Sequence, residues 1–464
     1  MRRRPALNVF LLTLALVLAA VVLVRPGGTA EPGDAFDGSG RVLVRNASLV
    51  LTMDPALGRL ADSDVLIEGT KIKAVGKDLD ARGARVIDGR GRIVLPGFVD
   101  THNHLWQSLI RGCAADDNLG GWLGRCVIPL YGAPVTDADG YAGARLSTVD
   151  LVGTGVTTTT DWSHAFNPAF ARGNLQALTD SKMRFVFAYY AGKDPARQEA
   201  LRAAKRDFVD SNALAKLQVA DVASEGNYDN LAASAKLAKD LGVPLNVHLL
   251  EAPSDLPTGQ MSALRRAGAL VPGLVADHVV QADNSVLDEL AADGVGVAHN
   301  PLSNMRLASG VAPVPEMAKR QMKVGLGLDG GTNDTSDMYN VMRAAVGLQR
   351  VKYTDPDVYP TAADVLRMAT LGGAEVLGLD REIGSLTPGK RADLQIVDAQ
   401  QVNFAPKVDW LNQLVFNTQP RNVGWVFVDG RALKRDGSVA GVDTGQVVRD
   451  AQVAADHLKQ LLPE

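Results

Sequence analysis

The sequence predicts an α/β protein in which an eight-stranded barrel carries a small β-rich domain built from both ends of the chain. Short apolar strands alternate with helical stretches through the middle of the chain, which is typical of βα units and a parallel sheet. Residues 41–98 and 384–440 instead show short strands separated by glycine turns. A chain of 464 residues is long enough for a barrel with an attached domain.

The two flanking segments, 41–98 and 384–440, are expected to meet in one β-sandwich-like domain. The first contains candidate strands at 41–49, 64–68, 71–75 and 92–95. The second contains candidate strands at 392–397 and 425–428, and Asp429-Gly430 then has the form of a hairpin turn. A closing amphipathic helix is expected at 443–461.

The segment between them, residues 99–383, is expected to form the barrel. A strand that ends near residue 100 would be the first of eight, and helices are clearest at 230–241 and 284–292. The other candidate strands are 155–160, 184–190, 217–223, 244–250, 275–281, 294–299 and 324–328. Because such barrels place their chemistry at the carboxyl ends of strands, polar residues at those ends are the candidates for function.

Two histidines, His102 and His104, follow the first of these strands. Residues 92–95 and Phe98-Val99 indicate a buried strand that arrives at the pair. Side chains two residues apart on a strand point the same way, so both imidazoles can bind one divalent metal. The chain has only seven histidines, which weighs against a chance pairing at this spacing. The pair predicts metal chemistry.

Further candidate ligands end other strands of the predicted barrel. His248 ends the fifth strand, His278 lies in the sixth, and Asp329 ends the eighth. With the first pair they supply three imidazoles and a carboxylate for a borderline divalent metal, with room for water. His299 ends the seventh strand and is interpreted as a support of the site.

The last strand admits two other interpretations. Residues 325–330 match the G-x-G-x-x-G pattern of a dinucleotide loop, which follows a strand and opens a helix. Leu326 and Leu328 instead have the pattern of a strand interior, which disfavours this alternative. Asp329 by itself is also compatible with a turn before Gly330-Gly331.

In these segments the chain resembles the amidohydrolase superfamily, specifically its cytosine-deaminase-like branch with the triazine chlorohydrolases and the adenosylhomocysteine and guanine deaminases. The resemblance covers about residues 41–440 in the expected order. The motifs that carry it are the run from Pro96 to His104, His248-x-x-Glu251, His299-Asn300-Pro301-x-Ser303-Asn304, Gly310-x-Ala312-Pro313-Val314-Pro315, Gly327-x-Asp329-Gly330, residues 368–374, and Gly384-Ser385-Leu386-x-Pro388-Gly389-Lys390-Arg391-Ala392-Asp393-Leu394.

The resemblance implies a distorted (β/α)8 barrel, or TIM barrel, with one divalent metal, zinc being favoured over iron. The metal lowers the pKa of a bound water toward about 7, and Asp329 takes the proton of that water. Glu251 is expected to carry a proton to the ring nitrogen or leaving group, and His278 to orient the nucleophile and polarise the electrophilic carbon. The implied metal ligands are His102, His104, His248 and Asp329.

Two features of the fourth strand refine this expectation. Binuclear members of the superfamily carry a carboxylated lysine at its end, where this chain has Val222-Ala223-Ser224-Glu225, while Lys216 lies at the start. One metal is therefore favoured. Many deaminases of the branch also carry a substrate-contacting His or Pro-Tyr segment near this strand, and none is evident here, which weighs against purine-nucleoside substrates.

Candidate substrate contacts lie just beyond the first and second strands and in the motif that follows the seventh. Each is equally compatible with packing inside a loop. They are Trp106, Gln107, Trp162, His164 and Asn304.

We therefore expect a metal-dependent hydrolase acting on a C–N bond of a nitrogen heterocycle or related small molecule, as an aminohydrolase or deaminase. An alternative within the same chemistry is hydrolytic removal of another leaving group, such as chloride. An alternative of another class is an exported binding protein that kept the barrel but lost catalysis. The intact set of candidate ligands argues against it.

Composition narrows the partners. Hydrophobic residues at 46% and charged residues at 22% are ordinary for a soluble globular protein. The net charge of −4 and the pI near 6.0 give no electrostatic basis for binding nucleic acid. A small-molecule substrate is expected, with membrane contact only through the N-terminal segment, and a homo-oligomer is compatible with the sequence.

The first thirty residues predict export. Arginines at positions 2–4 precede the apolar stretch 6–24, as in a signal peptide, and Gly28-Thr29-Ala30 offers small residues for cleavage. The stretch is also long enough for an uncleaved membrane anchor. We expect residues 1–30 to be a signal peptide or an anchor, and the catalytic part to be secreted or anchored outside the cytoplasm.

Cys113 and Cys126 are the only cysteines. Export would permit a disulfide between them. Two unpaired buried thiols are equally compatible with the sequence, which does not fix the distance between them.

Overall fold

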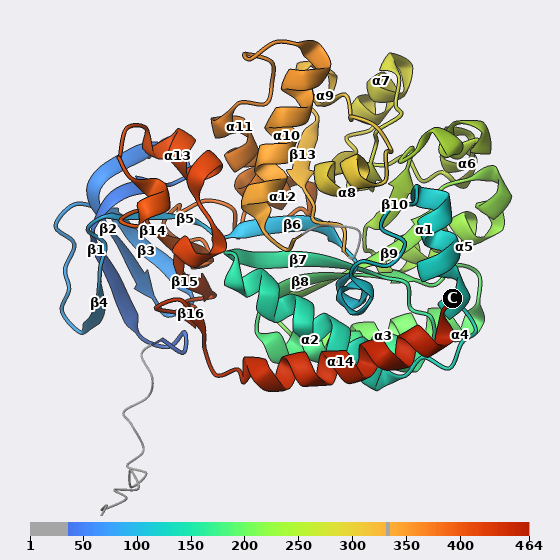
Figure 1. The fold of residues 1–464 in the computed structure, drawn as a ribbon, viewed down its shortest axis with the longest axis horizontal. Coiled ribbons are helices and arrows are strands. Elements are labelled where there is room, and N and C mark those ends of the chain that lie inside the picture. Colours follow the sequence, from blue (N-terminus) through green and yellow to red (C-terminus); the bar gives the residue numbers. More distant parts are fainter. Residues whose placement is uncertain (1–35, 331–334, 464) are drawn as a thin grey trace, which may run out of the picture. The chain divides into compact units, whose positions relative to one another are not determined.

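A computed structural model describes residues 36–330 and 335–463, and it contains the predicted barrel (Figure 1). Eight strands pair in parallel and in chain order. They are β6 (Phe98–Asn103), β7 (Val156–Ser163), β8 (Arg184–Tyr190), β9 (Ala215–Val222), β10 (Leu245–Leu249), β11 (Val275–His278), β12 (Gly296–His299) and β13 (Lys323–Leu326).

The first and last strands approach each other at their carboxyl ends. The backbone N–H groups of Leu328 and Asp329 donate to the carbonyl oxygen of His102, at 3.0 and 2.8 Å. The Leu328 N–H also lies 2.9 Å from a carboxylate oxygen of the buried Asp100. These bonds join the segment after β13 to β6. The candidate ligands that follow the first and the last barrel strand therefore lie close together.

Helices surround the barrel strands (Figure 1). Their starts follow capping rules: Thr136 and Asp139 form a capping box at α2, and Asp194 caps α4 ahead of a proline. The barrel helices are α1 (Leu119–Cys126), α2 (Asp137–Gly153), α3 (Pro168–Ser181), α4 (Pro195–Ala204), α5 (Tyr228–Leu241), α6 (Gln260–Ala267), α7 (Asn284–Ala292), α8 (Pro301–Arg306), α9 (Val314–Lys319), α10 (Met338–Tyr353), α11 (Ala362–Arg367) and α12 (Gly373–Val376).

A second, mixed sheet unites both ends of the described chain, as the sequence predicts. Its central pair joins β5 to β14 in antiparallel register, so that Arg92 faces Asp398 and Pro96 faces Leu394. Strand order is β17-β16-β15-β14-β5-β1-β2-β3, and β4 pairs with β1. The members are β1 (Arg41–Leu51), β2 (Arg59–Glu68), β3 (Lys71–Gly76), β4 (Ala84–Asp88), β5 (Arg92–Pro96), β14 (Leu394–Asp398), β15 (Val423–Val428), β16 (Arg431–Arg435) and β17 (Ser438–Val439).

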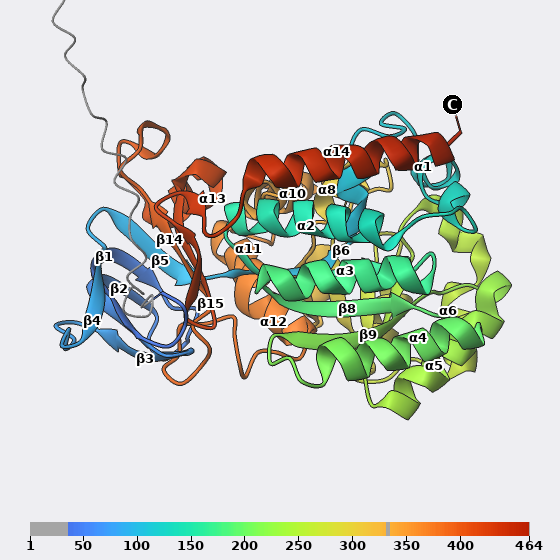
Figure 2. The same ribbon diagram turned by 90° about the horizontal axis from the view of Figure 1, so that it is seen from below.

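Two further helices complete the described chain. α13 (Trp410–Asn417) precedes β15, and α14 (Thr444–Leu461) lies along α2 (Figure 2). The buried residues Ala451, Ala454 and Leu458 of α14 join the apolar cluster that also contains Trp106 and Trp122. The closing helix therefore packs against the loops that follow β6.

Several barrel strands end earlier than the sequence pattern predicts. Residues 244–250 and 275–281 were expected as strands, whereas β10 ends at Leu249 and β11 at His278. Leu250 has a φ of 49°, and His278 and Val279 have φ of 72° and 51°. A left-handed backbone cannot continue a strand. Each strand therefore ends at these residues, although the apolar run in the sequence continues into the loop.

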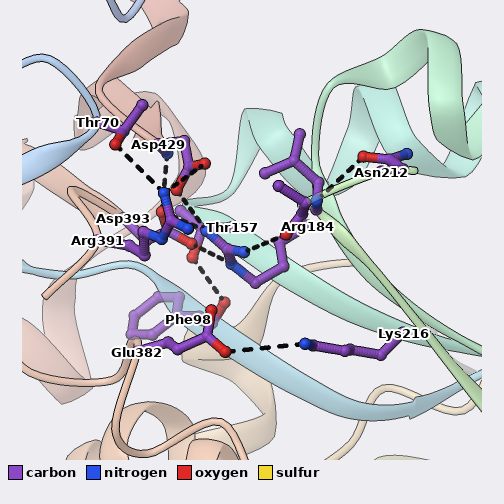
Figure 3. A network of polar contacts seen from close by, with 12 residues as sticks. Thr70, Phe98, Thr157, Arg184, Asn212, Lys216, Glu382, Arg391, Asp393 and Asp429 are labelled. Atoms are coloured by element: carbon purple, nitrogen blue, oxygen red, sulfur yellow. Dashed lines mark hydrogen bonds and ion pairs between the residues drawn. The ribbon is translucent and has the colours of Figure 1, made fainter. Parts of the chain in front are cut away.

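A buried ion cluster joins the barrel to the mixed sheet (Figure 3). Arg184, at the start of β8, is 1% exposed; its Nε donates to Asp393 at 2.8 Å and its Nη2 to Asp429 at 2.6 Å. Asp393 precedes β14, and Asp429 lies in the turn between β15 and β16. One guanidinium thus neutralises two carboxylates of the other sheet.

Arg184→Met is expected to lower the free energy of unfolding by about 3–5 kcal/mol, because it leaves the buried carboxylate of Asp393 without a cation, while Asp429 keeps Arg391 at 3.5 Å. Lys216→Gln, which removes the half-exposed partner of Glu382 at 3.8 Å, should cost only about 0.2–1 kcal/mol. Urea unfolding of both variants compares them. Equal stabilities would show that the buried cluster contributes no more than a surface pair.

Candidate metal centre

The predicted ligands lie together at the carboxyl end of the barrel. One ring nitrogen each of His102, His104 and His248 lie within 4.8 Å of one another. The Asp329 Oδ1 atom is 3.3 Å from His102 Nε2 and 3.4 Å from His104 Nε2. His278 also enters the cluster, with His102 and Asp329. Four imidazoles and a carboxylate therefore converge from β6, β10, β11 and the end of β13.

Neighbouring groups orient the first two imidazoles. His104 Nδ1 lies 2.6 Å from the carbonyl oxygen of Trp162. A carbonyl oxygen can only accept a hydrogen bond, so His104 Nδ1 is the donor. His102 Nδ1 faces the buried carboxylate of Asp277 at 3.1 Å. With the His104 Nδ1 proton held by this carbonyl and the Asp277 carboxylate beside His102 Nδ1, the Nε2 atoms of both rings face Asp329, which is the arrangement seen around metal-bound histidines.

The donor set fits a divalent metal. His102 Nε2 and His248 Nδ1 are buried and make no hydrogen bond among the described residues. Buried ring nitrogens without partners are costly, and a cation would satisfy them. Imidazole nitrogens with one carboxylate oxygen are ligands typical of zinc and of other borderline metals.

The surroundings shift the pKa values of the two carboxyl groups of the site, Asp329 and Glu251, in opposite directions. Burial acts to raise the pKa of Asp329, but the nearby imidazoles, His102 first among them, hold it well below its usual range. Burial and repulsion from Asp329 raise the pKa of Glu251 well above its usual range. The surroundings thus favour the charged form of Asp329 and the acid form of Glu251.

Glu251 and His278 form a second pair beside the ligands. His278 Nε2 lies 3.6 Å from Glu251 Oε2. On its other side, His278 Nδ1 accepts from the amide groups of Asn304 and Asn300, at 3.0 and 3.2 Å. This places the Nε2 proton on the side of Glu251. The Glu251 N–H donates to Asp255, which fixes the start of the loop.

The backbone at Asp329 is specialised. Its φ is 65°, a left-handed conformation that costs a non-glycine residue about 1–3 kcal/mol. Two residues earlier, a Cβ on Gly327 would lie 2.1 Å from the Asn300 side-chain oxygen. The glycines that resemble a dinucleotide loop instead serve this close approach: Gly325 lies inside β13, and among the described residues the next helix begins at Met338.

A cavity of about 410 Å³ opens onto His104, His248 and Asp329. Of the predicted substrate contacts, Gln107, Trp162 and His164 line it. Trp106 lies behind this wall and donates its indole N–H to His164 at 3.0 Å. Asn304 contacts His278 instead of the cavity.

Sequence reasoning missed the far wall of this cavity. The apolar face of α1 and the segment after it supply most of that wall, while Tyr190 ends β8 and Arg197 lies on α4. Apart from Tyr190, none of these side chains has a strand-end signal. They are Leu119, Trp122, Leu123, Val127, Ile128, Tyr131, Tyr190 and Arg197.

Cys113 and Cys126 are joined by a disulfide. The structure thus decides between the two alternatives for this pair. The closed loop contains α1, whose Trp122 is buried against the apolar cluster beneath the cavity. The bond therefore constrains the segment that carries the apolar wall.

Comparison with known proteins places these features in a family. The model of the amidohydrolase family matches residues 93–433. The 5'-deoxyadenosine deaminase of Methanobrevibacter smithii is 30% identical over 439 residues, which is 90% of this chain and 98% of that protein. The 5'-deoxyadenosine deaminase of Methanosarcina mazei is 32% identical, with the same coverage of both chains.

Solved structures of related enzymes superpose on this chain. A triazine hydrolase from Arthrobacter aurescens superposes with a TM-score of 0.83 at 25% identity, covering 90% of this chain and all of that one. An adenosine deaminase from Xanthomonas campestris with bound zinc has a TM-score of 0.81 at 26% identity, covering 90% of this chain and 98% of that one.

The expectation of an exported, secreted or anchored protein is wrong in the light of these comparisons. The deaminases from Methanobrevibacter smithii and Methanosarcina mazei match over 98% of their length, and no export signal is described for them. In residues 36–330 and 335–463, no helix has the length and apolar character needed to cross a membrane. The predicted signal peptide or anchor, residues 1–30, lies outside the described residues.

Proposed function

Because the chain belongs to the amidohydrolase family, we propose that it is a metal-dependent deaminase that hydrolyses a C–N bond of an aminated nitrogen heterocycle. The observation that carries this proposal is the cluster of His102, His104, His248 and Asp329, which faces a cavity beside the acid Glu251.

We assign the metal ligands as His102, His104, His248 and Asp329, and the metal as zinc in preference to iron. Bound zinc in the Xanthomonas campestris neighbour supports this choice. A divalent metal held there would supply a nucleophile at neutral pH, because such a metal lowers the pKa of a coordinated water to about 7. Asp329, whose pKa is held low, would accept the proton that activation of this water releases.

Glu251 and His278 act on the substrate. The raised pKa of Glu251 favours its acid form, which can donate to the ring nitrogen or to the departing amine. His278, whose Nδ1 is occupied by two amide groups, presents its Nε2 proton to the polar atoms of the reacting carbon. Trp162, Gln107 and His164 line the cavity where the heterocycle would lie.

The substrates of the relatives suggest where to look first. The curated relatives act, by name, on 5'-deoxyadenosine, and the solved neighbours are a triazine hydrolase and an adenosine deaminase. Aminopurine nucleosides are therefore the first class to test, ahead of amino- and chlorotriazines. The lack of a recognisable His or Pro-Tyr segment near β9 sets this chain apart from many such deaminases.

Ammonia release tests the proposal directly. Metal-loaded protein is incubated with 5'-deoxyadenosine, adenosine and an aminotriazine, and ammonia is measured beside chloride release from a chlorotriazine. Glu251→Gln protein is the background control. Ammonia from at least one amine, above that background, is the expected result. Chloride release without ammonia from any amine would replace deamination by dechlorination.

Asp277→Asn is expected to weaken metal binding by about 10- to 100-fold, because Asp277 orients His102 through its Nδ1 edge. Competition with a metal-binding dye measures the change. Asp221→Asn is the matched control, because Asp221 is equally buried on β9, two strands away from β11, but contacts Ser234 and Asn227. Equal affinities for the two variants would remove Asp277 from the metal site.

A further inference from the structure

A fifth imidazole borders the cavity beside the candidate ligands. His164 follows the end of β7, and its ring centroid lies 4.6 Å from that of His104. It lines the same cavity as His248 and Glu251. Among the described residues it nevertheless belongs to neither group of side chains that could hold a metal. The position of His164 therefore suits contact with a ligand.

Trp106 determines which ring nitrogen of His164 carries the proton. Its indole Nε1–H donates to His164 Nδ1 at 3.0 Å. Because an indole N–H can only donate a hydrogen bond, His164 Nδ1 is the acceptor and bears no proton. The proton of the neutral imidazole is therefore on Nε2. Trp106 is completely buried, so this bond is shielded from bulk water.

The Nε2–H group is the donor that His164 offers to the cavity. Nδ1 is turned toward Trp106, which lies behind the cavity wall, whereas the imidazole itself forms part of that wall. The bond from Trp106 is the one hydrogen bond that the ring makes within the described residues. A donor that lines a ligand cavity without a partner is matched by an acceptor on the ligand, because leaving it unpaired in the complex costs free energy.

Aromatic neighbours hold the imidazole in this orientation. It stacks on Phe166, with the ring centroids 5.5 Å apart and the planes inclined by 21°. Trp162 meets it edge-on, with centroids 5.4 Å apart. These contacts and the bond from Trp106 fix the direction of the Nε2–H group before any ligand binds. A donor that is fixed in advance loses little conformational freedom on binding.

His164 and Glu251 face the cavity from different sides of the barrel. His164 follows β7 and Glu251 follows β10, and β8 and β9 lie between these strands. A heterocycle whose reacting C–N unit lies against Glu251 therefore turns a different part of its ring toward His164. In an aminated nitrogen heterocycle that part can carry a second ring nitrogen with a free lone pair, as N3 and N7 of adenine do.

From this arrangement we propose that His164 is a specificity-determining residue, whose Nε2–H donates to an unprotonated ring nitrogen of the substrate, other than the nitrogen beside Glu251. The proposal rests on the deaminase function above and narrows its substrate class to heterocycles with at least two ring nitrogens. Trp106 is a positioning residue, because it acts through Nδ1 of His164. Neither side chain takes a proton from the substrate or gives one to it.

Matched ligands that differ in one ring nitrogen test the proposal. Adenosine is compared with 3-deazaadenosine and 7-deazaadenosine, and an aminotriazine with the aminopyrimidine in which one ring nitrogen is replaced by CH. Binding to metal-loaded protein is measured by calorimetry, and KM and kcat by ammonia release. In at least one comparison, wild-type protein should bind the parent compound about tenfold or more tighter than the analogue, because the analogue leaves the Nε2–H group unpaired.

Variants assign this preference to His164. In His164→Phe, which keeps an aromatic ring but has no N–H, the ratio of parent to analogue affinity should fall toward one, through KM rather than kcat. His164→Gln, which again places an N–H donor there, should keep part of the ratio. Trp106→Phe should also lower the ratio, because Nδ1 can then carry the proton instead of Nε2. His457→Phe, on α14 outside the cavity, should keep the full ratio.

A double variant guards against a loss of stability. His164→Phe leaves the buried indole N–H of Trp106 without an acceptor, which destabilises the fold. Trp106→Phe/His164→Phe removes that group as well, and circular dichroism shows which variants are folded. Metal content should equal that of wild type in every variant. No binding of any parent compound, a ratio near one in wild-type protein, an unchanged ratio in the folded double variant, or loss of its metal overturns the proposal.

The outcomes separate this proposal from the proposed function. If amines are deaminated but every analogue binds as tightly as its parent, the function holds and the role of His164 does not. If the analogues bind more weakly in wild type, and equally well in His164→Phe, but no ammonia appears from any substrate, the role of His164 holds and deamination does not.

Discussion

His104→Ala is expected to remove most of the bound metal and, with it, the activity. Protein purified without chelator should contain about one tightly held divalent metal per chain. His104 Nε2 lies 3.4 Å from Asp329 Oδ1, and its Nδ1 is held by the Trp162 carbonyl. Elemental analysis after gel filtration gives the metal content of each variant.

His457→Ala is the matched control for this measurement. His457 lies on α14, where its Nδ1 contacts Asp139 at 2.9 Å, outside the group of candidate ligands. Its loss should leave the metal content unchanged. Circular dichroism shows whether His104→Ala remains folded. A folded His104→Ala protein with a full complement of metal would refute the assignment of this histidine as a ligand.

The barrel could be predicted from the sequence because each of its strands is a local apolar run. A strand that is buried on both faces is a continuous run of apolar residues, so it can be identified from the local sequence alone. His102, His104, His248 and Asp329 follow such runs, and the carboxyl ends of parallel strands meet on one face. The convergence of these four side chains therefore followed from local patterns and the barrel topology.

The far wall of the cavity could not be predicted in this way. Tyr131, Tyr190 and Arg197 belong to three separate segments, and their meeting depends on the path of the loops after β6 and β8. Arg197 has the sequence pattern of an ordinary helix-surface residue. Only the packing against two rings shows that its charge faces a cavity. Asp277 was missed for a similar reason, because a carboxylate inside a strand gives no sign of which histidine it contacts.

Strand ends were predicted too far for a physical reason that also concerns function. His278 and Asp329 leave their strands in left-handed backbone, which hydrophobic periodicity cannot reveal. Such strained positions are held in place by their surroundings and are frequent in active sites. The segments where the pattern failed are therefore segments that carry the candidate catalytic groups.

Glu251→Gln is expected to lower kcat by about a hundredfold or more while the metal content stays that of the wild type. Attack on a ring carbon creates a tetrahedral centre, and the departing nitrogen must be protonated before its bond breaks. Glu251 can supply that proton because burial and the charge of Asp329 raise its pKa and so favour its acid form. Glutamine keeps the shape of the side chain and its place 3.6 Å from His278, but it carries no transferable acid proton.

Asp329→Asn separates this role from that of a metal ligand. Asp329 faces both His102 and His104, so its substitution should lower the metal content and the turnover together. In Glu251→Gln only turnover should fall. The loss of turnover should be smaller for a substrate whose leaving group, such as chloride, departs without being protonated, because its bond to the ring carbon breaks without the proton of Glu251. Ammonia release and elemental analysis on the same preparations measure both quantities. Near-normal kcat in Glu251→Gln, on a substrate whose amine must be protonated to leave, would assign the proton to another group.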